Sequence, residues 1–336
     1  MFLIGIDNGF CDNDGEPRTP DMIELFIEGS AVMTPLHHPW IKLKEHIDQE
    51  DYVRINKLRE LCLQEDQTAL KLELDYKLAS HPNPSQSASV QEINEFMHYD
   101  GELLIGYIGI SGFGGSSLPI EVNGMVHPAY RRQGVFSKLW DLVTSEWKRR
   151  NASDMLLLSD RKSHAGQRFI EGTGAAYHHS EYEMDLNEER CASISKPLQD
   201  IAFRKATNAD AREIARQNAV FFNDESEEIS ILPEEEEQRG MTIYLAEKDQ
   251  QIVGKAHVQL ASGTGGIYGL GVLPEHRGKG YGRAVLLMAV QKLLEAKASR
   301  IMLQVAADNS NALHLYKSCG FEETSTMDYY AIKRTT

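Results

Sequence analysis

The sequence predicts a mixed α/β fold, with α+β character, built from two similar halves. In the second half, a strand-like run from Ile267 to Leu273 leads into a glycine-rich turn, and a helical pattern follows with apolar residues three and four apart. The same order recurs about 146 residues earlier, where Gly134 takes the place of Gly280. A repeat of this length in a 336-residue chain predicts two related domains in tandem.

The turn from Arg277 to Gly282 is typical of an anion-binding site. The first turn of a helix carries unpaired N–H groups and the positive end of the helix dipole. Glycines let those amides approach a phosphate closely. We therefore expect a phosphate or pyrophosphate on residues 278–283. The spacing Gly-Lys-Gly-Tyr-Gly matches neither a P-loop nor the dinucleotide fingerprint.

Two motifs point to one family. The loop reads R-x-x-G-x-G from Arg277, and about thirty residues later N-x-x-A-x-x-x-Y-x-x-x-G-F begins at Asn309. These resemble the coenzyme A loop and the second signature of the GNAT superfamily of N-acetyltransferases. The resemblance implies two GNAT folds in tandem, each with a mixed sheet in which strands four and five splay. Acetyl-CoA would lie in that notch as cosubstrate.

The resemblance also implies which residues bind the cofactor. Backbone amides of strand four would pair with its pantetheine arm, the loop would hold the pyrophosphate, and the start of the second-signature helix would complete the site. The expected cofactor-binding residues are Leu270, Gly271, Val272, Arg277, Gly278, Lys279, Gly280, Tyr281, Gly282, Arg283, Asn309 and Asn311.

Composition excludes several other classes of function. The net charge of −15 argues against nucleic-acid binding, which needs a concentrated basic face, and favours a cationic amine as acceptor. The sequence shows neither a signal-peptide pattern nor an apolar stretch of membrane-spanning length, so we expect a cytoplasmic protein without a membrane partner.

Metal chemistry is not expected either. The adjacent His37 and His38 lack a further ligand at metal-binding spacing. The cysteines are scattered and predict free thiols. They are Cys11, Cys62, Cys191 and Cys319.

The predicted domain organisation has four parts. Residues 1–40 form an N-terminal extension, residues 41–187 the first GNAT-like domain, residues 188–200 a linker, and residues 201–336 the second domain. In the first domain we expect a second helical run carrying Leu70, Leu74 and Leu78. In the second domain we expect the strands in residues 324–332 to close the sheet.

The two predicted domains are not equivalent. In the first, Phe136 stands where the second has Gly282, which leaves coenzyme A binding there open. Ile170 stands at the position of Tyr316, and Ser163 replaces Asn309. Neither Ile170 nor Phe169, the other possible match, can donate a proton, so the first domain is predicted to be catalytically degenerate. Tyr177 or His164 remains a possible substitute.

Acetyl transfer to an amine requires a neutral amine, a stabilised oxyanion and a proton for the leaving thiolate. A lysine ammonium has a pKa of ~10.4 and an α-ammonium ~8, so a base must remove a proton. Amides near residues 270–272 could stabilise the oxyanion. The resemblance places the hydroxyl of Tyr316 beside the thioester sulfur and implies that it is the acid.

The base is less defined by the sequence. Strand four, Gly265 to Val272, contains no carboxylate. We favour Glu225 or Glu228 in the acidic segment 223–237, which would either attract a cationic amine or form a solvated surface. The alternatives are Glu227, His257 and Tyr268 acting through water.

The predicted activity is acetyl-CoA-dependent N-acetyltransfer to a primary amine, by direct attack in the second domain. The acceptor would be a small amine or a peptide. Two alternatives remain: a non-catalytic protein that binds or senses acyl-CoA, and an acetyltransferase of protein N-termini or lysines.

Overall fold

The structure is a computed structural model, and it describes residues 34–79, 92–112, 119–150, 152–192, 201–222 and 232–334. Residues 33–336 form one compact unit. The turns and short strands expected within residues 1–33 lie outside the described residues. None of the helices within the described ranges is long and apolar enough to cross a membrane.

The first half follows the predicted alternation of strands and helices. Asp48 caps the first long helix by accepting a hydrogen bond from the backbone N–H of Asp51. The expected second helical run is shorter than predicted, because Glu73 adopts a left-handed φ of 52° and helix begins only at Leu74. The elements are β1 (Pro39–Lys44), α1 (Gln49–Asp66), α2 (Leu74–Ala79), β2 (Glu95–Asp100), β3 (Leu103–Ser111), β4 (Ile120–Val126), α3 (Val135–Arg149), β5 (Asp154–Asp160), α4 (His164–Thr173) and β6 (Ala176–Leu186).

The second half repeats this order. A short helix, α5 (Glu188–Ala192), lies at the start of the predicted linker. The further elements are β7 (Ala202–Lys205), α6 (Ala211–Phe222), α7 (Pro233–Gln238), β8 (Met241–Lys248), β9 (Gln251–Ala261), β10 (Thr264–Val272), α8 (Tyr281–Glu295), β11 (Arg300–Ala306), α9 (Ser310–Ser318) and β12 (Phe321–Lys333). The bounds of α3 and β5 reappear in α8 and β11 with an offset of 146 residues, which confirms the internal repeat.

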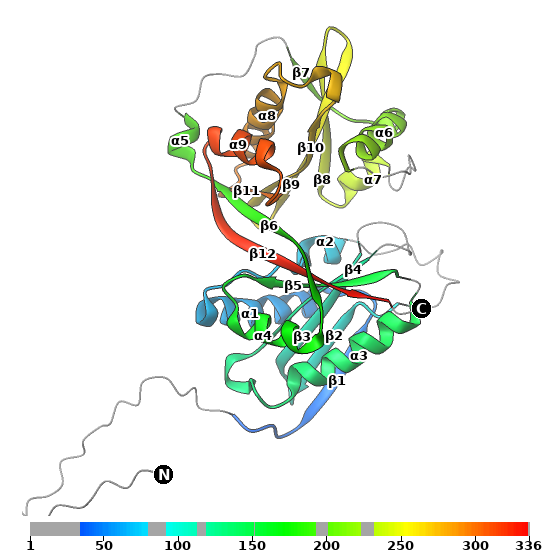
Figure 1. The fold of residues 1–336 in the computed structure, drawn as a ribbon, viewed down its shortest axis with the longest axis vertical. Coiled ribbons are helices and arrows are strands. Elements are labelled where there is room, and N and C mark those ends of the chain that lie inside the picture. The colour runs from blue at the N-terminus through cyan, green and yellow to red at the C-terminus, as the bar shows by residue number, and fades with distance from the viewer. Residues whose placement is uncertain are drawn as a thin grey trace, which may run out of the picture. The chain divides into compact units, whose positions relative to one another are not determined.

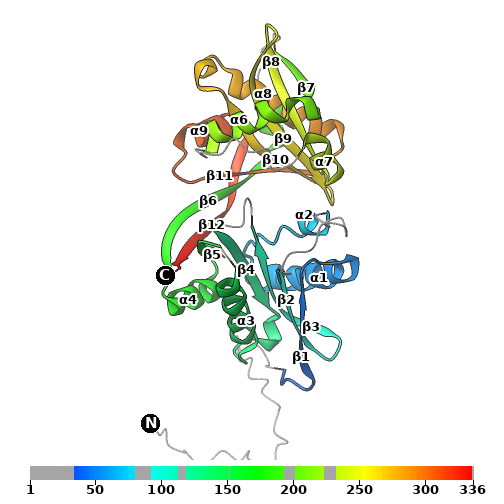
Figure 2. The same ribbon diagram turned by 90° about the vertical axis from the view of Figure 1, so that its right-hand side faces the viewer.

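The described strands form one mixed sheet in the order β1-β2-β3-β4-β5-β12-β6-β11-β10-β9-β8-β7. β6, from the first half, lies between β11 and β12 of the second half. β12 in turn lies between β5 and β6. Figures 1 and 2 show these two long strands running side by side from one half into the other. The expectation that residues 324–332 close only the second domain's sheet is therefore wrong, since each half contributes a strand to the other.

A buried polar cluster joins the exchanged strands to the first half. The ammonium of Lys71 lies 3.1 Å from the carboxylate of Glu181 on β6 and donates a 2.6 Å hydrogen bond to the hydroxyl of Tyr329 on β12. That hydroxyl donates to Glu181 at 2.6 Å. Although burial alone would lower it, the pKa of Lys71 is raised by the surrounding carboxylates of Glu181, Glu121 and Glu73. A charged lysine thus ties three segments together.

Apolar packing on both faces of the sheet holds the helices in place. In the second half, α8 buries Val285, Leu286, Ala289, Val290 and Leu293 against β9, β10 and β11. This spacing of three and four residues keeps one helix face on the sheet. Complete burial of each large aliphatic side chain contributes about 1.5–3 kcal/mol. The start of α8 is therefore firmly positioned beside the end of β10.

Candidate acetyl-CoA site

A notch opens in each half where two parallel strands part. β10 pairs with β11 only from Thr264 to Ile267, although β10 continues to Val272. β4 pairs with β5 only from Ile120 to Val122 and continues to Val126. The splaying implied by the family resemblance is thus present in both halves.

The glycine-rich turn at the end of β10 is held by its arginine. The Nε of Arg277 donates to the carbonyl of Val272 at 2.9 Å. Gly280 caps α8 with a left-handed φ of 82°, so the chain enters the helix directly from the turn. The N–H groups of residues 281–283 have no carbonyl partner within the helix. They form an anion-binding helix start at the mouth of the notch.

Cationic side chains surround this helix start. Arg277 and Lys279 are exposed, and the ammonium of Lys279 donates to the carbonyl of Glu275 at 3.1 Å. The guanidinium of Arg283 donates to the hydroxyl of Ser318 at 3.1 Å, which links the turn to α9. Three cations around a helix N-terminus match the charge of a pyrophosphate.

β10 carries a bulge beside the notch. Its register with β9 shifts between Tyr268 and Gly271, and Gly269 has a φ of +52°. A bulge leaves residues without a partner in the ladder, here Gly269 and Leu270. β4 pairs with β3 without such a shift. In the second half, strand four therefore has backbone groups without a ladder partner where the thioester is expected. The pairing of β4 with β3 in the first half leaves none at that place.

The second-signature helix faces the same notch. Asn309 caps α9, and its side-chain oxygen accepts a hydrogen bond from the N–H of Ala312 at 3.1 Å. Asn311 is exposed in the first turn. Tyr316 is 8% exposed, and burial raises the pKa of its phenol to about 12. Its phenol is therefore protonated at neutral pH, as a proton donor must be.

In the first half, aromatic side chains fill the space beside the turn. The ring of Phe136 packs edge-to-face on Phe169 with centroids 4.6 Å apart, and Trp140 contacts the other side of Phe169. In the second half, a Cβ added to Gly282 would already lie 3.3 Å from the side chain of Leu315. The absence of a side chain at residue 282 therefore lets α9 pack closely against the start of α8.

The turn of the first half is also covered from outside. The guanidinium of Arg131 forms a two-pronged ion pair with the carboxylate of Asp66, at 2.7 and 2.6 Å. The side-chain amide of Gln133 donates to the carbonyl of Thr34 at 2.8 Å. Arg131 still donates from Nε to the carbonyl of Val126, as Arg277 does to Val272. The backbone turn is conserved between the halves, but its side chains bind other parts of the chain.

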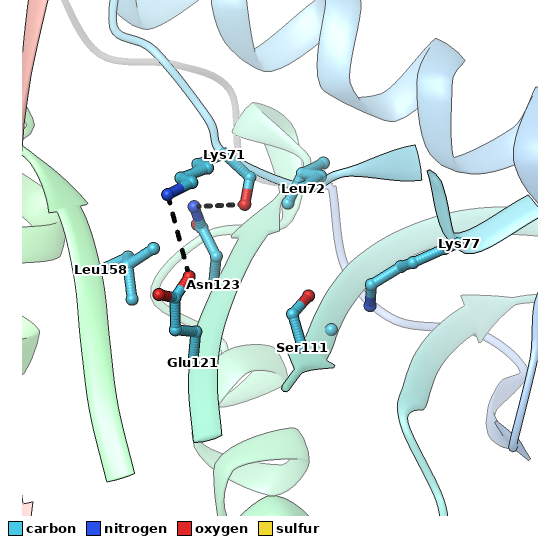
Figure 3. Close-up of a pocket in the computed structure, with 8 residues that line it drawn as sticks. Lys71, Leu72, Lys77, Ser111, Glu121, Asn123 and Leu158 are labelled. Carbon is cyan, nitrogen blue, oxygen red and sulfur yellow. Dashed lines mark hydrogen bonds and ion pairs between the residues drawn. The ribbon is translucent and has the colours of Figure 1, made fainter. Parts of the chain in front are cut away.

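The segment between α1 and α2 lies over the first half's notch. The N–H of Ala69 donates to the carboxylate of Asp160 at 2.7 Å, and the side chain of Asn123 donates to the carbonyl of Lys71 at 3.2 Å. Figure 3 shows Lys71, Glu121, Asn123 and Leu158 around the small polar hollow that remains. The segment thus bridges β4 and β5 where the two strands part.

The favoured bases cannot be placed. Glu225 and Glu228, together with Glu227, lie outside the described residues. Tyr268 turns back along its strand, where its ring would contact a Cβ added to Gly266. The alternative base His257 lies on β9 next to the bulge, since the ring would be 3.3 Å from a Cβ at Gly269.

A residue that the sequence analysis missed accompanies His257. Lys255 is fully buried, and its ammonium nitrogen lies 3.0 Å from Nε2 of His257. It also donates to the carbonyl of Gly269 at 3.0 Å. Burial lowers the pKa of Lys255 to about 7. The available signal was a single lysine in the run Ile252–Val258, whose one other polar side chain is that of His257.

No group of three or more potential metal ligands gathers within the described ranges. Of the cysteines, Cys62 and Cys319 are buried. The site is therefore described by backbone amides, cationic side chains, Tyr316 and the Lys255–His257 pair.

Comparisons with known proteins agree with this geometry. Residues 208–321 match the acetyltransferase (GNAT) family model. A mycothiol acetyltransferase of Kocuria rhizophila is 35% identical over 91 residues, which span 25% of this chain and 30% of that relative. A mycothiol acetyltransferase of Renibacterium salmoninarum is 26% identical over 344 residues, covering 96% of this chain and 95% of the relative.

Solved structures share the two-half fold. A GCN5-related N-acetyltransferase from Sphaerobacter thermophilus aligns with a TM-score of 0.63 at 16% identity and covers 88% of this chain and 95% of its own. A tandem GNAT protein from the clavulanic acid biosynthesis pathway aligns with a TM-score of 0.65 at 13% identity, covering 89% of this chain and 99% of its own. At these identities the likeness concerns the fold.

Proposed function

We propose that the second half, which carries the match to the acetyltransferase (GNAT) family, transfers acetyl from acetyl-CoA to a primary amine by direct attack. The observation that carries the proposal is the notch of the second half, where the β10–β11 splay, the β10 bulge and the helix start at Gly280 adjoin. In the first half the equivalent strands are bridged by the segment between α1 and α2.

In the proposed complex, the pyrophosphate lies on the N–H groups of residues 281–283, with Arg277, Lys279 and Arg283 balancing its charge. The thioester carbonyl lies at the bulge, where the amides of Leu270 to Val272 stabilise the oxyanion. Asn309 and Asn311 lie at the start of α9, beside the cofactor. Holding amine and thioester together in the notch supplies the proximity contribution to rate.

Tyr316 is the proposed acid. Direct attack forms a C–N bond, breaks the C–S bond and leaves a thiolate, which accepts the phenolic proton. The raised pKa of Tyr316 keeps that proton in place until the thiolate forms. The acceptor ammonium must first lose a proton, because only a neutral amine is a nucleophile. Glu225 and Glu228 are the bases favoured from the sequence, and their acidic segment would attract the cationic acceptor.

The first half is proposed to be a non-catalytic partner. The boundaries 41–187 and 201–336 remain the proposed domains, with the exchange of β6 and β12 joining them. Because Ile170 replaces the tyrosine and aromatic rings fill the passage, we expect neither turnover nor coenzyme A binding there.

A turnover screen tests the proposal. Acetyl-CoA would be incubated with amino acids, amino sugars, aminoglycosides, peptides and, because of the named relatives, mycothiol-related amines. Acetylated product would be detected by mass spectrometry, since a thiol-bearing acceptor interferes with colorimetric detection of free coenzyme A. We expect at least one amine to give product and Tyr316→Phe to give far less. Absence of product with every amine, despite acetyl-CoA binding, would contradict the proposal.

A further inference from the structure

The buried lysine on β9 has no role in the chemistry described so far. Lysine is almost never fully buried unless it is paired, because removing an ammonium from water is costly. Lys255 is 0% exposed, and no described carboxylate forms an ion pair with it. Its partners are the Nε2 of His257 and the carbonyl of Gly269, both at 3.0 Å. An unpaired lysine at this depth needs a reason beyond stability.

The elements around Lys255 present few other polar groups. α6 presents the rings of Phe221 and Phe222, whose centroids lie 5.6 and 5.9 Å from the ammonium nitrogen. β8 places Leu245 opposite Lys255 in register. Within the described residues, the titratable group that faces Lys255 is His257. The acidic stretch that follows Phe222 lies outside those residues.

His257 connects this lysine to the proposed reaction centre. Its ring touches the bulge at Gly269, the residue before Leu270, whose amide is proposed to face the thioester carbonyl. The side chain is partly exposed, whereas Lys255 behind it is not. Its Nε2 faces Lys255, and no described residue hydrogen-bonds to its other nitrogen, Nδ1. One imidazole nitrogen thus faces the lysine while the other is free for a substrate.

The first half has a different residue in this place. The pairs Gly106–Val126 and Gly254–Val272 are equivalent, so Tyr107 of β3 takes the position of Lys255. Tyr107 is fully buried, and its hydroxyl donates to the carboxylate of Glu95. Burial raises its pKa well above the ordinary value, so this group cannot accept a proton at neutral pH. The half with the filled notch lacks the lysine–histidine pair.

We propose that His257 and Lys255 form a two-residue relay that accepts the proton of the acceptor ammonium. This inference rests on the proposed acetyltransfer in the second half. The acceptor N–H bond breaks as Nδ1 of His257 takes the proton, and the Nε2 proton passes to the neutral amine of Lys255. The imidazole is neutral again in its other tautomer, and Lys255 holds the charge between the Gly269 carbonyl and two aromatic rings. After product release the proton returns to solvent by the reverse path.

The acid–base properties of the pair suit proton transfer from the acceptor through His257 to Lys255. Burial and then the neighbouring Lys255 lower the pKa of His257 well below its usual range, so the ring conducts a proton without retaining it. The pKa of Lys255 is about 7, so its amine is available as a proton acceptor above that pH. A base with a pKa near the working pH is the most effective kind.

The test compares the pH dependence of kcat/KM in wild type and Lys255→Met, with the best amine found in the turnover screen. At pH 7.5 we expect Lys255→Met and His257→Gln to lower kcat/KM by about 10²–10⁴-fold. The deficit should shrink towards pH 10, because a growing fraction of the acceptor is then already neutral. Lys255→Arg should resemble Lys255→Met, since a guanidinium cannot accept a proton. A deficit that is equal at all pH values, or full activity in Lys255→Arg, would overturn the relay.

Two controls separate the relay from folding. Lys77→Met removes another buried lysine, which contacts Tyr107 and Glu95 in the first half, and should leave the shape of the pH profile unchanged. Acetyl-CoA affinity of the Lys255 variants should equal that of wild type. In protein labelled with ¹³Cε-lysine, one resonance should titrate near pH 7 and disappear in Lys255→Met; titration above pH 10 would refute the relay. Absence of turnover with any amine would instead refute the proposed function.

Discussion

The two halves share a backbone and differ in the space around it. Gly134 and Gly280 both cap their helices with left-handed φ values of 75° and 82°, and both turns are held by an arginine that donates to the end of strand four. In the first half, Phe136 packs on Phe169 and the residues between α1 and α2 bridge the splayed strands, whereas Gly282 brings no side chain to the turn of the second half. The turn is thus a feature of the backbone that both halves share. Whether it binds a cofactor depends on the side chains around it.

The sharpest way to test this contrast is to remove the proposed acid. Tyr316→Phe keeps the ring in its apolar surroundings and removes the proton donor, so kcat should fall by about 10³-fold. Acetyl-CoA affinity should stay nearly unchanged. The matched change in the first half is Ile170→Val, which should leave kcat unaltered. Steady-state kinetics together with calorimetric binding of acetyl-CoA would measure both, and a loss of affinity equal to the loss of kcat would assign Tyr316 to binding instead.

The polar cluster of the first half should matter for stability rather than for catalysis. Lys71→Met leaves the carboxylates of Glu181 and Glu121 without their cation, and breaking such a partly buried pair costs up to about 3 kcal/mol. Urea unfolding would show the loss. Lys292→Met, which removes an exposed pair with Glu295, should change the free energy of unfolding much less. Equal effects of the two variants would contradict the proposed role of Lys71 in joining the exchanged strands.

Replacing Gly282 by phenylalanine, the residue that the first half has at this position, should obstruct the notch of the second half. In Gly282→Phe the new side chain must displace Leu315, which already lies 3.3 Å from a Cβ at this position. We expect acetyl-CoA affinity to fall about 100-fold, or about 2.7 kcal/mol. Gly282→Ala is the graded control and should lose much less. Unchanged affinity in Gly282→Phe would show that the aromatic filling of the first half does not decide binding.

The smallest predicted effect concerns stability against pH. Unfolded lysine titrates near ~10.4, whereas burial lowers the pKa of Lys255 to about 7. Between these values the unfolded chain binds a proton that the folded chain does not, so folding becomes more favourable as pH rises. Relative to Lys255→Met, the free energy of unfolding of wild type should rise by up to about 1.4 kcal/mol between pH 8 and pH 9. The free energies of unfolding of both proteins would be measured with urea at each pH. If they changed with pH in parallel, the lowered pKa of Lys255 would be contradicted.

Much of the fold could be predicted from the sequence because its signals are local. The alternation in residues 241–247 and the spacing of Val285, Leu286 and Ala289 report strand and helix directly. The exchange of β6 and β12 could not be predicted, since a strand has the same alternating pattern whichever sheet it joins. The left-handed backbone of Glu73 likewise delays until Leu74 a helix that the leucine spacing had indicated from Leu70.

The candidate site was only partly predictable for a similar reason. Motif spacing located the turn and Asn309, because these depend on residues close together in sequence. Lys255 was missed because its importance comes from complete burial beside His257 and Gly269, which depends on three strands and a helix. The filling of the first notch by residues 67–73 depends on contacts with β4 and β5, which no local pattern reports.

The central claim is that one half alone binds acetyl-CoA, and binding stoichiometry tests it most directly. Isothermal titration of the full chain with acetyl-CoA should give one site per chain, and that site should be lost or strongly weakened in Gly282→Phe. Two sites per chain, or a single site that Gly282→Phe leaves intact, would contradict the account.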